Sequence, residues 1–88
     1  MIVIKRDGHE ESFNRNKAYK SVYESCLNAH HKKKNAIIIA KKVINDLVKE
    51  LHDKKKTNTD EIFKLISTLL EKYDVDAAFL YETHRDVS

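Results

Sequence analysis

Val-Ile-Lys-Arg-Asp-Gly-His-Glu-Glu-Ser-Phe-Asn, residues 3–14, decides how this chain begins to fold. The stretch starts with β-branched side chains and two cations, which favours a short strand. Asp7-Gly8 follows, the dipeptide that supplies the positive φ angles of a two-residue type I′ hairpin turn. The sequence therefore predicts a β-hairpin over residues 2–13, with Asn14 placed to cap a helix directly after it.

Four helices are expected after the hairpin, because apolar residues recur there at spacings of three and four. Asn35 and Thr59 are the expected N-caps of the second and third helices. Each helix is too short to be stable alone, so the four must pack into a bundle. The polar connection at residues 52–58 has room for a short strand but shows no clear signal for one. The expected helix bounds are 15–30, 36–51, 59–73 and 75–85.

Composition places the chain among small globular proteins. Its 88 residues fit a single domain spanning residues 1–88, and 41% of them are apolar, enough for one core. No apolar run approaches the ~18 residues of a membrane span, and the charged start is unlike a secretory signal. Cys26 has no second cysteine to pair with, so we expect a reducing, cytoplasmic environment and no membrane partner.

Three cations are expected to lie close together. Lys5 and Arg6 stand just before the turn, and Lys17 lies in the first turn of the following helix. If the hairpin folds over that helix, the three side chains converge near the free backbone N–H groups of its N-terminus. This arrangement suits a polyphosphate without a glycine-rich loop, and the net charge of +3 agrees. The residues alone leave the alternative open, a solvated hairpin with ordinary surface lysines.

The same stretch resembles the opening of a known regulatory module. The pattern Val-x-Lys-Arg-Asp-Gly-x-x-Glu-x-Phe-Asn-x-x-Lys over residues 3–17 is similar to the start of the ATP-cone domain. Thr-Asp-Glu-Ile at residues 59–62, Ala-Ala-Phe-Leu-Tyr at residues 77–81, and Arg85 agree with its later helices. That domain is the allosteric module of many ribonucleotide reductases and of the ribonucleotide-reductase repressor. The resemblance implies an α+β fold, a four-helix bundle capped by a small three-stranded sheet.

The resemblance also implies which residues contact a nucleotide. The first strand would lie against the base, and its two cations would meet the phosphates. Three residues from the second strand into the first helix would fix the base, ribose or phosphates, and two residues from later helices would close the far side. The residue of the first strand is Val3, and the two cations are Lys5 and Arg6. The three residues that fix the nucleotide are Glu11, Asn14 and Lys17, and those that close the far side are Thr59 and Arg85. Asp7 and Gly8 form the turn of the site.

The implied ligand is ATP or dATP with Mg²⁺, and the implied function is regulatory. The domain would sense adenine nucleotides and act on a ribonucleotide reductase or transcriptional regulator in trans, or through a homo-oligomer. We expect a free-standing cone, because neither reductase cysteines nor a zinc ribbon accompany it. Phe63 departs from relatives that place a polar or histidine side chain there. Glu82 departs from relatives that often have arginine.

The residues leave other classes of function open. A small basic nucleic-acid-binding protein would use Lys32–Lys34 and Lys54–Lys56 on phosphates, although acidic residues are interleaved along most helices. An interaction module without ligand is the second alternative, against which the retained hairpin motif argues. An enzyme is least expected, because no nucleophile has an adjacent base and the turn is expected to use Asp7. His30-His31 would point about 100° apart on a helix, so no metal site is expected there.

Overall fold

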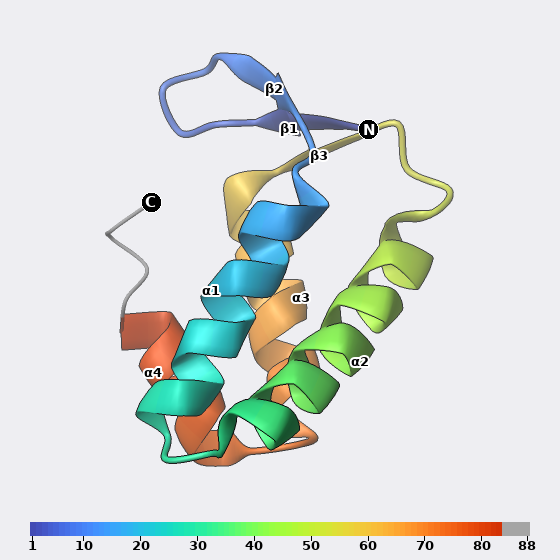
Figure 1. Ribbon diagram of the computed structural model, residues 1–88. Helices are drawn as coiled ribbons and strands as arrows, with labels where there is room; N and C mark the ends of the chain where they lie inside the picture. The colour runs from blue at the N-terminus through green and yellow to red at the C-terminus, as the bar shows by residue number, and fades with distance from the viewer. Residues whose placement is uncertain (84–88) are drawn as a thin grey trace.

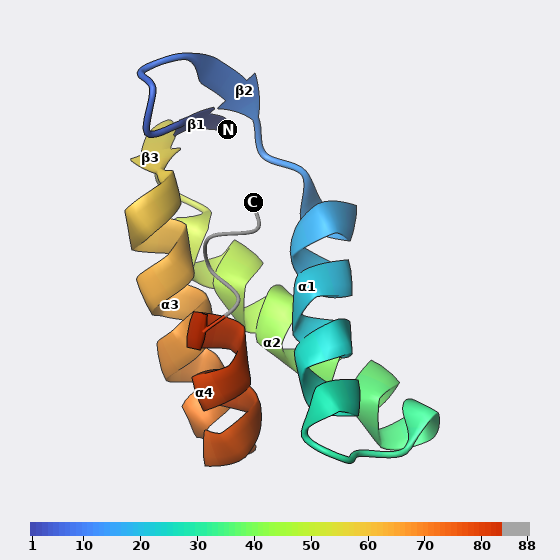
Figure 2. The same cartoon turned by 90° about the vertical axis from the view of Figure 1, so that its left-hand side faces the viewer.

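The computed structural model describes residues 1–83 and shows the predicted α+β class, with a small sheet capping one end of a helix bundle (Figure 1). Helices α1 (Arg15–Asn28) and α3 (Thr59–Glu71) each pack against both α2 (Lys33–Leu51) and α4 (Val75–Thr83). Consequently α2 and α4 stand at opposite corners of the bundle, as the two views show (Figures 1 and 2). The elements are β1 (Ile2–Ile4), β2 (Glu10–Ser12), α1 (Arg15–Asn28), α2 (Lys33–Leu51), β3 (Lys56–Asn58), α3 (Thr59–Glu71) and α4 (Val75–Thr83).

The sheet has three strands in the order β2-β1-β3. β1 pairs antiparallel with β2, placing Val3 opposite Glu11, and parallel with β3, placing Val3 opposite Thr57. Val3 and Thr57 are both buried. Their burial between the sheet and the bundle explains why a strand with the polar sequence Lys-Thr-Asn forms there. The sequence shows this strand poorly because its pairing partner lies more than fifty residues away.

The hairpin forms, but its turn differs from the predicted type I′. The Gly8 N–H donates to the Lys5 carbonyl, and the Lys5 N–H donates to the His9 carbonyl, so the loop has three residues. Gly8 has a φ of 92°, whereas Asp7 is not among the residues with positive φ. A type I′ turn needs positive φ at both central residues, and a three-residue loop needs it at one. Glycine at that position removes the steric penalty that a side chain would add.

The core lies between the four helices. The largest fully buried side chains come from α1, α2 and α3, and small residues of α4 close the remaining side. Cys26 is buried among them, and burial raises the pKa of its thiol to about 11. Within residues 1–83, no helix is both long enough and apolar enough to cross a membrane. The core is formed by Val22, Cys26, Ala36, Ala40, Val43, Ile44, Leu47, Leu51, Ile66, Leu69, Leu70, Ala77 and Ala78.

The α1–α2 corner differs from its expected bounds. α1 ends at Asn28, two residues early, because His30 adopts a left-handed φ of 71°. The N–H of His31 then donates to the Cys26 carbonyl and that of His30 to the Leu27 carbonyl, a Schellman ending. α2 begins at Lys33 with no side-chain cap, so the prediction that Asn35 caps it is wrong.

The capping residue of α3 also needs correction. The side chain of Asn58 accepts a hydrogen bond from the Glu61 N–H at 2.8 Å, so Asn58 is the N-cap and Thr59 is the first helical residue. The helix ends at Glu71, where residue 73 was expected. Asn14, by contrast, caps α1 as predicted, accepting from the Lys17 N–H at 3.0 Å. The expected end of α4 at residue 85 lies outside the described residues.

Candidate functional site

A cavity of about 640 Å³ opens between the sheet, α1, α3 and α4. The sheet covers the end of the bundle where α1 and α3 lie apart (Figure 2). The cavity takes its lining from the hairpin and from these two helices, together with Tyr81 of α4. Its lining combines apolar side chains with cations, amides and hydroxyls, the composition of a small-molecule site. The lining residues are Val3, Lys5, Arg6, Glu11, Ser12, Phe13, Asn14, Lys17, Ala18, Ser21, Glu24, Ser25, Asn28, Thr59, Ile62, Phe63, Ile66 and Tyr81.

The hairpin supplies the cationic edge of the cavity. Side chains alternate along a strand, so Val3 and Lys5 both face the bundle, and Arg6 follows in the turn. The Lys5 Nζ lies 3.4 Å from a carboxylate oxygen of Glu11, and the Arg6 guanidinium lies 3.4 Å from Asp60. This hydrogen bond from Lys5 is the main cause that lowers the pKa of Glu11. Each of the two cations is therefore paired with a carboxylate, of which that of Glu11 lines the cavity.

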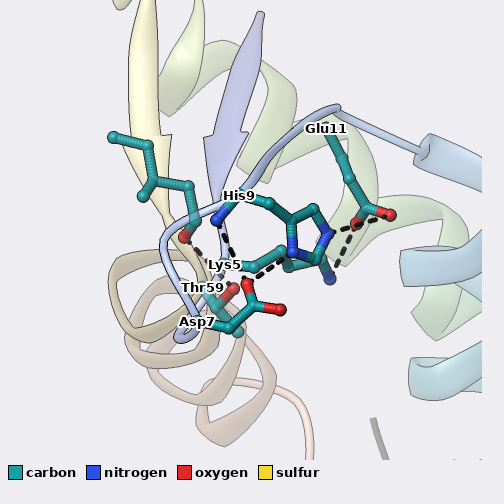
Figure 3. A network of polar contacts seen from close by, with 6 residues as sticks. Lys5, Asp7, His9, Glu11 and Thr59 are labelled. Atoms are coloured by element: carbon teal, nitrogen blue, oxygen red, sulfur yellow. Dashed lines mark hydrogen bonds and ion pairs between the residues drawn. The ribbon is translucent and has the colours of Figure 1, made fainter.

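His9 links the turn to the second strand (Figure 3). Its ring lies between the carboxylates of Asp7, which contacts Nδ1, and Glu11, whose oxygen is 3.6 Å from Nε2. The His9 backbone N–H also donates to Asp7, and this bond is the main cause that lowers the Asp7 pKa. The hairpin thus holds Asp7 in its own turn and away from the cavity.

Helix α1 contributes a third cation and a polar face. Lys17 lies in the first turn, and no carboxylate within residues 1–83 forms an ion pair with its ammonium group. The first backbone N–H groups of α1 lie nearby, and they carry partial positive charge. Ser21 and Ser25 follow on the same face, each donating its hydroxyl to a carbonyl one turn earlier. This edge of the cavity can therefore receive negative charge without first breaking an ion pair.

Two aromatic rings form part of the far wall. Phe63 of α3 and Tyr81 of α4 are stacked, with centroids 5.3 Å apart and planes at 21°. Thr59, one turn before Phe63, donates its hydroxyl to the Ile4 carbonyl at 3.5 Å and so ties α3 to the sheet. The side chain of Glu82 contacts the Ser67 hydroxyl, so this departure from the family pattern points to α3.

Most of the expected site residues meet at this cavity. Asp7 and Gly8 do not line it, since both are used by the turn, and Arg85 lies outside the described residues. The residues that sequence reasoning missed include a polar stripe along α1. Its spacing of three and four, opposite the apolar stripe, is a signal that could have revealed it. The expected residues that line the cavity are Val3, Lys5, Arg6, Glu11, Asn14, Lys17 and Thr59; the missed stripe is Ser21, Glu24, Ser25 and Asn28.

Comparison with known protein families gives a match over nearly the full chain. The model of the ATP cone domain matches residues 1–87. The comparison with curated proteins gave no match. The match spans every element described above, from β1 to α4.

Proposed function

The chain belongs to the ATP cone family, a family of nucleotide-sensing regulatory modules, and from this membership we propose that it binds ATP or dATP in the cavity beneath the hairpin. One observation carries the proposal. Lys5 directly follows β1, Arg6 lies in the turn and Lys17 in α1, and all three line the same cavity beside the N-terminus of α1. Such a cluster supplies both full charges and backbone N–H groups for phosphates.

The phosphates are expected to replace the carboxylates that are paired with Lys5 and Arg6. Lys5 and Arg6 are paired with Glu11 and Asp60, and both pairs are partly exposed. Exposed pairs of this kind are worth about 0–1 kcal/mol, so a triphosphate can replace the carboxylates at small cost. Among residues 1–83, Lys17 has no such pair to break. A carboxylate released in this way, such as that of Glu11, is a candidate ligand for the accompanying Mg²⁺.

The nucleoside is expected to occupy the inner part of the cavity. Val3, Ile62 and Ile66 provide apolar surface there, and Phe63 stacked on Tyr81 provides a flat aromatic wall. An adenine ring fits such a surface because stacking needs only a π-face. We therefore propose that Phe63 stacks on the base, at the position where relatives place a polar or histidine side chain.

The proposed role is sensing, with no catalysis by this domain. A bound nucleotide would shift the domain toward a conformation with a different affinity for a partner protein or for a second copy. A ribonucleotide reductase or a transcriptional regulator is the class of partner that the family suggests. The position of Asp7 supports a non-enzymatic role. Asp7 is the carboxylate closest in sequence to Lys5 and Arg6, but its side chain is hydrogen-bonded within the turn and does not line the cavity. It is therefore not placed to assist a reaction at a bound phosphate.

Nucleic-acid binding receives no comparable support. Lys32–Lys34 lie at the α1–α2 corner, whereas Lys54–Lys56 lie beside the sheet at the other end of the bundle (Figure 1). Lys54 contacts Glu61 and Lys56 lies 3.7 Å from Glu10, so part of the second triplet is paired. The two triplets therefore form no continuous basic surface.

Calorimetric titration with ATP, dATP and GTP, each with Mg²⁺, tests the proposal. The variant Lys5→Ala/Arg6→Ala removes two cations at the cavity, and we expect it to lose at least tenfold in affinity for the adenine nucleotides. Lys42→Ala/Lys49→Ala removes the same charge from exposed positions on α2 and should bind as the native chain does. Repeating the titration with EDTA shows whether Mg²⁺ contributes.

Two results would contradict the proposed function. One is the absence of saturable heat with any nucleotide at millimolar concentration. The other is equal weakening by the cavity variant and the α2 variant, which would mean that net charge alone attracts nucleotides.

A further inference from the structure

A second cavity, a shallow groove of about 270 Å³, lies between α1 and α2. It shares no lining residue with the cavity beneath the hairpin, because the two cavities use opposite faces of α1. Small-molecule pockets usually measure about 300–1,000 Å³, so this groove suits a group smaller than a nucleotide. The lining residues are Arg15, Asn16, Tyr19, Lys41, Ile44 and Asn45.

The polar lining of this groove consists of hydrogen-bond donors. The guanidinium, ammonium, amide and phenol groups can all donate, and no carboxylate lines the groove. Acidic residues of the same two helices lie elsewhere. Glu24 lines the nucleotide cavity, and Asp46 accepts a hydrogen bond from the Tyr73 hydroxyl at 3.4 Å. The groove therefore combines positive charge and donors with no negative charge to balance them.

The two cations of the groove come from different helices. Arg15 lies at the start of α1 and Lys41 lies in α2, and within residues 1–83 neither forms an ion pair. The Arg15 guanidinium donates to the Oδ1 of Asn45 at 2.5 Å, which orients it. Because this bond uses the amide oxygen, the amide nitrogen of Asn45 keeps its donors for a ligand. An anion can therefore enter without first breaking an ion pair.

We propose that this groove binds the phosphate group of a small anion, either inorganic phosphate or pyrophosphate. The planar guanidinium of Arg15 would bind two phosphate oxygens together, and Lys41 would add a point charge from the other helix. A phosphate suits the groove better than a carboxylate, since it carries more charge and more acceptor oxygens. The bound anion would join α1 to α2 and so stabilise the bundle.

This site is separate from the proposed nucleotide site and does not depend on it. The nucleotide cavity has more than twice the volume and an aromatic wall for a base, whereas the groove has space for the anion alone. Pyrophosphate is expected to bind more tightly than phosphate, because its second phosphate group can reach the cation of the second helix.

An NMR titration of the full chain with pyrophosphate, at constant ionic strength, tests this proposal. We expect saturable amide shifts at Arg15, Lys41 and Asn45, with half-saturation at about 1 mM or below. A parallel titration with inorganic phosphate should show the same shifts at higher concentration. Pyrophosphate can also enter the cavity beneath the hairpin, so the titration is repeated with Lys5→Ala/Arg6→Ala. The shifts at the groove should remain in that variant, because the two cavities share no residue.

Substitutions in the groove identify the side chains that bind the anion. Arg15→Gln/Lys41→Gln should weaken pyrophosphate binding at least tenfold, because both charges are lost. Lys41→Gln alone should weaken it severalfold and leave the fold intact, since this exposed ammonium group forms no ion pair within residues 1–83. The matched control, Lys42→Gln/Lys49→Gln, removes two charges from exposed positions of α2 outside the groove and should bind as the native chain does.

Three results would overturn the proposal. The first is the absence of saturable shifts at the groove at tens of millimolar pyrophosphate, including shifts confined to the cavity beneath the hairpin. The second is equal weakening by the groove variants and the α2 control, which would mean that net charge alone attracts the anion. The third is tighter binding of a single-stranded oligonucleotide at the groove, which would indicate a nucleic-acid surface.

Discussion

Thr57 has a buried hydroxyl with no hydrogen-bond partner within the described part of the chain. An unsatisfied buried polar group costs about 1–3 kcal/mol. Thr57→Val keeps the shape and the β-branched side chain while removing the polar atom, so we expect it to raise the free energy of unfolding by about 1 kcal/mol. Urea unfolding measures the change.

The matched control is Thr68→Val, an exposed position on α3 where no such gain is expected. A loss of stability in Thr57→Val would show that the hydroxyl has a partner, such as a bound water. That result would mean that a hydrogen bond of Thr57, and not burial alone, holds β3 in place.

His30 is the non-glycine residue with positive φ among residues 1–83. The left-handed conformation costs a residue with a side chain roughly 1 kcal/mol, and glycine avoids this cost. We expect His30→Gly to raise the midpoint of thermal unfolding. His52→Gly should lower it, because His52 has an ordinary helical φ of −53° and glycine there adds backbone freedom. Equal effects of the two substitutions would contradict the assigned role of His30 in the Schellman ending.

At the scale of elements, Asp74 joins the two turns at the far end of the bundle. One carboxylate oxygen accepts the N–H groups of Asp76 and Ala77 and so caps α4, and the other contacts the His31 ring. Burial raises the pKa of Asp74, but the hydrogen bonds from His31 and the two N–H groups outweigh it, so the pKa lies below its usual 3.8. The charged carboxylate therefore stabilises the fold at pH above that value.

We expect Asp74→Ala to lower the free energy of unfolding by about 2 kcal/mol at pH 6, through loss of the cap and the His31 contact. Asp74→Asn keeps a capping oxygen and should cost less. The difference between the native chain and Asp74→Asn should shrink as the pH falls below 3.8, because the native carboxyl then gains its proton. A difference that is independent of pH would show that the charge of Asp74 contributes nothing.

Local signals predicted some elements well and others poorly. The Asp-Gly dipeptide located the hairpin, and Asn14 located the start of α1, because both act through neighbouring residues. The strand β3 depends on pairing with β1, a distant part of the chain, and no local signal marks it. The turn type and the start of α2 were predicted wrongly although their hydrogen bonds join neighbouring residues. The cap of α3 was assigned one residue late, because Asn58 and Thr59 are both good capping residues and only the contact to Glu61 separates them.

At the scale of the whole molecule, the same distinction applies to the cavity. The hairpin motif predicted its cationic edge, since Lys5, Arg6 and Lys17 lie within one short stretch. The aromatic wall could not be predicted, because Phe63 and Tyr81 meet only once α3 and α4 pack together. The resemblance implied a nucleotide site at the hairpin. The fold adds the side chains of α1, α3 and α4 that line the same cavity.

A ligand that binds the folded chain but not the unfolded chain must stabilise the fold. At a nucleotide concentration a hundredfold above the dissociation constant, the gain is about 2.7 kcal/mol. We expect ATP to raise the midpoint of thermal unfolding of the native chain, and to raise it much less for Lys5→Ala/Arg6→Ala. An equal rise in both chains would place the binding site away from the hairpin.

An NMR titration that follows every backbone amide as ATP with Mg²⁺ is added tests most directly whether the nucleotide binds beneath the hairpin. We expect saturable shifts at the residues lining the cavity, from Val3 and Lys5 through Lys17 to Phe63. We expect little change at the outer face of α2. Shifts that instead follow Lys32–Lys34 and Lys54–Lys56 without saturating would rule out the proposed site, because they would indicate a general attraction of the basic chain for phosphates.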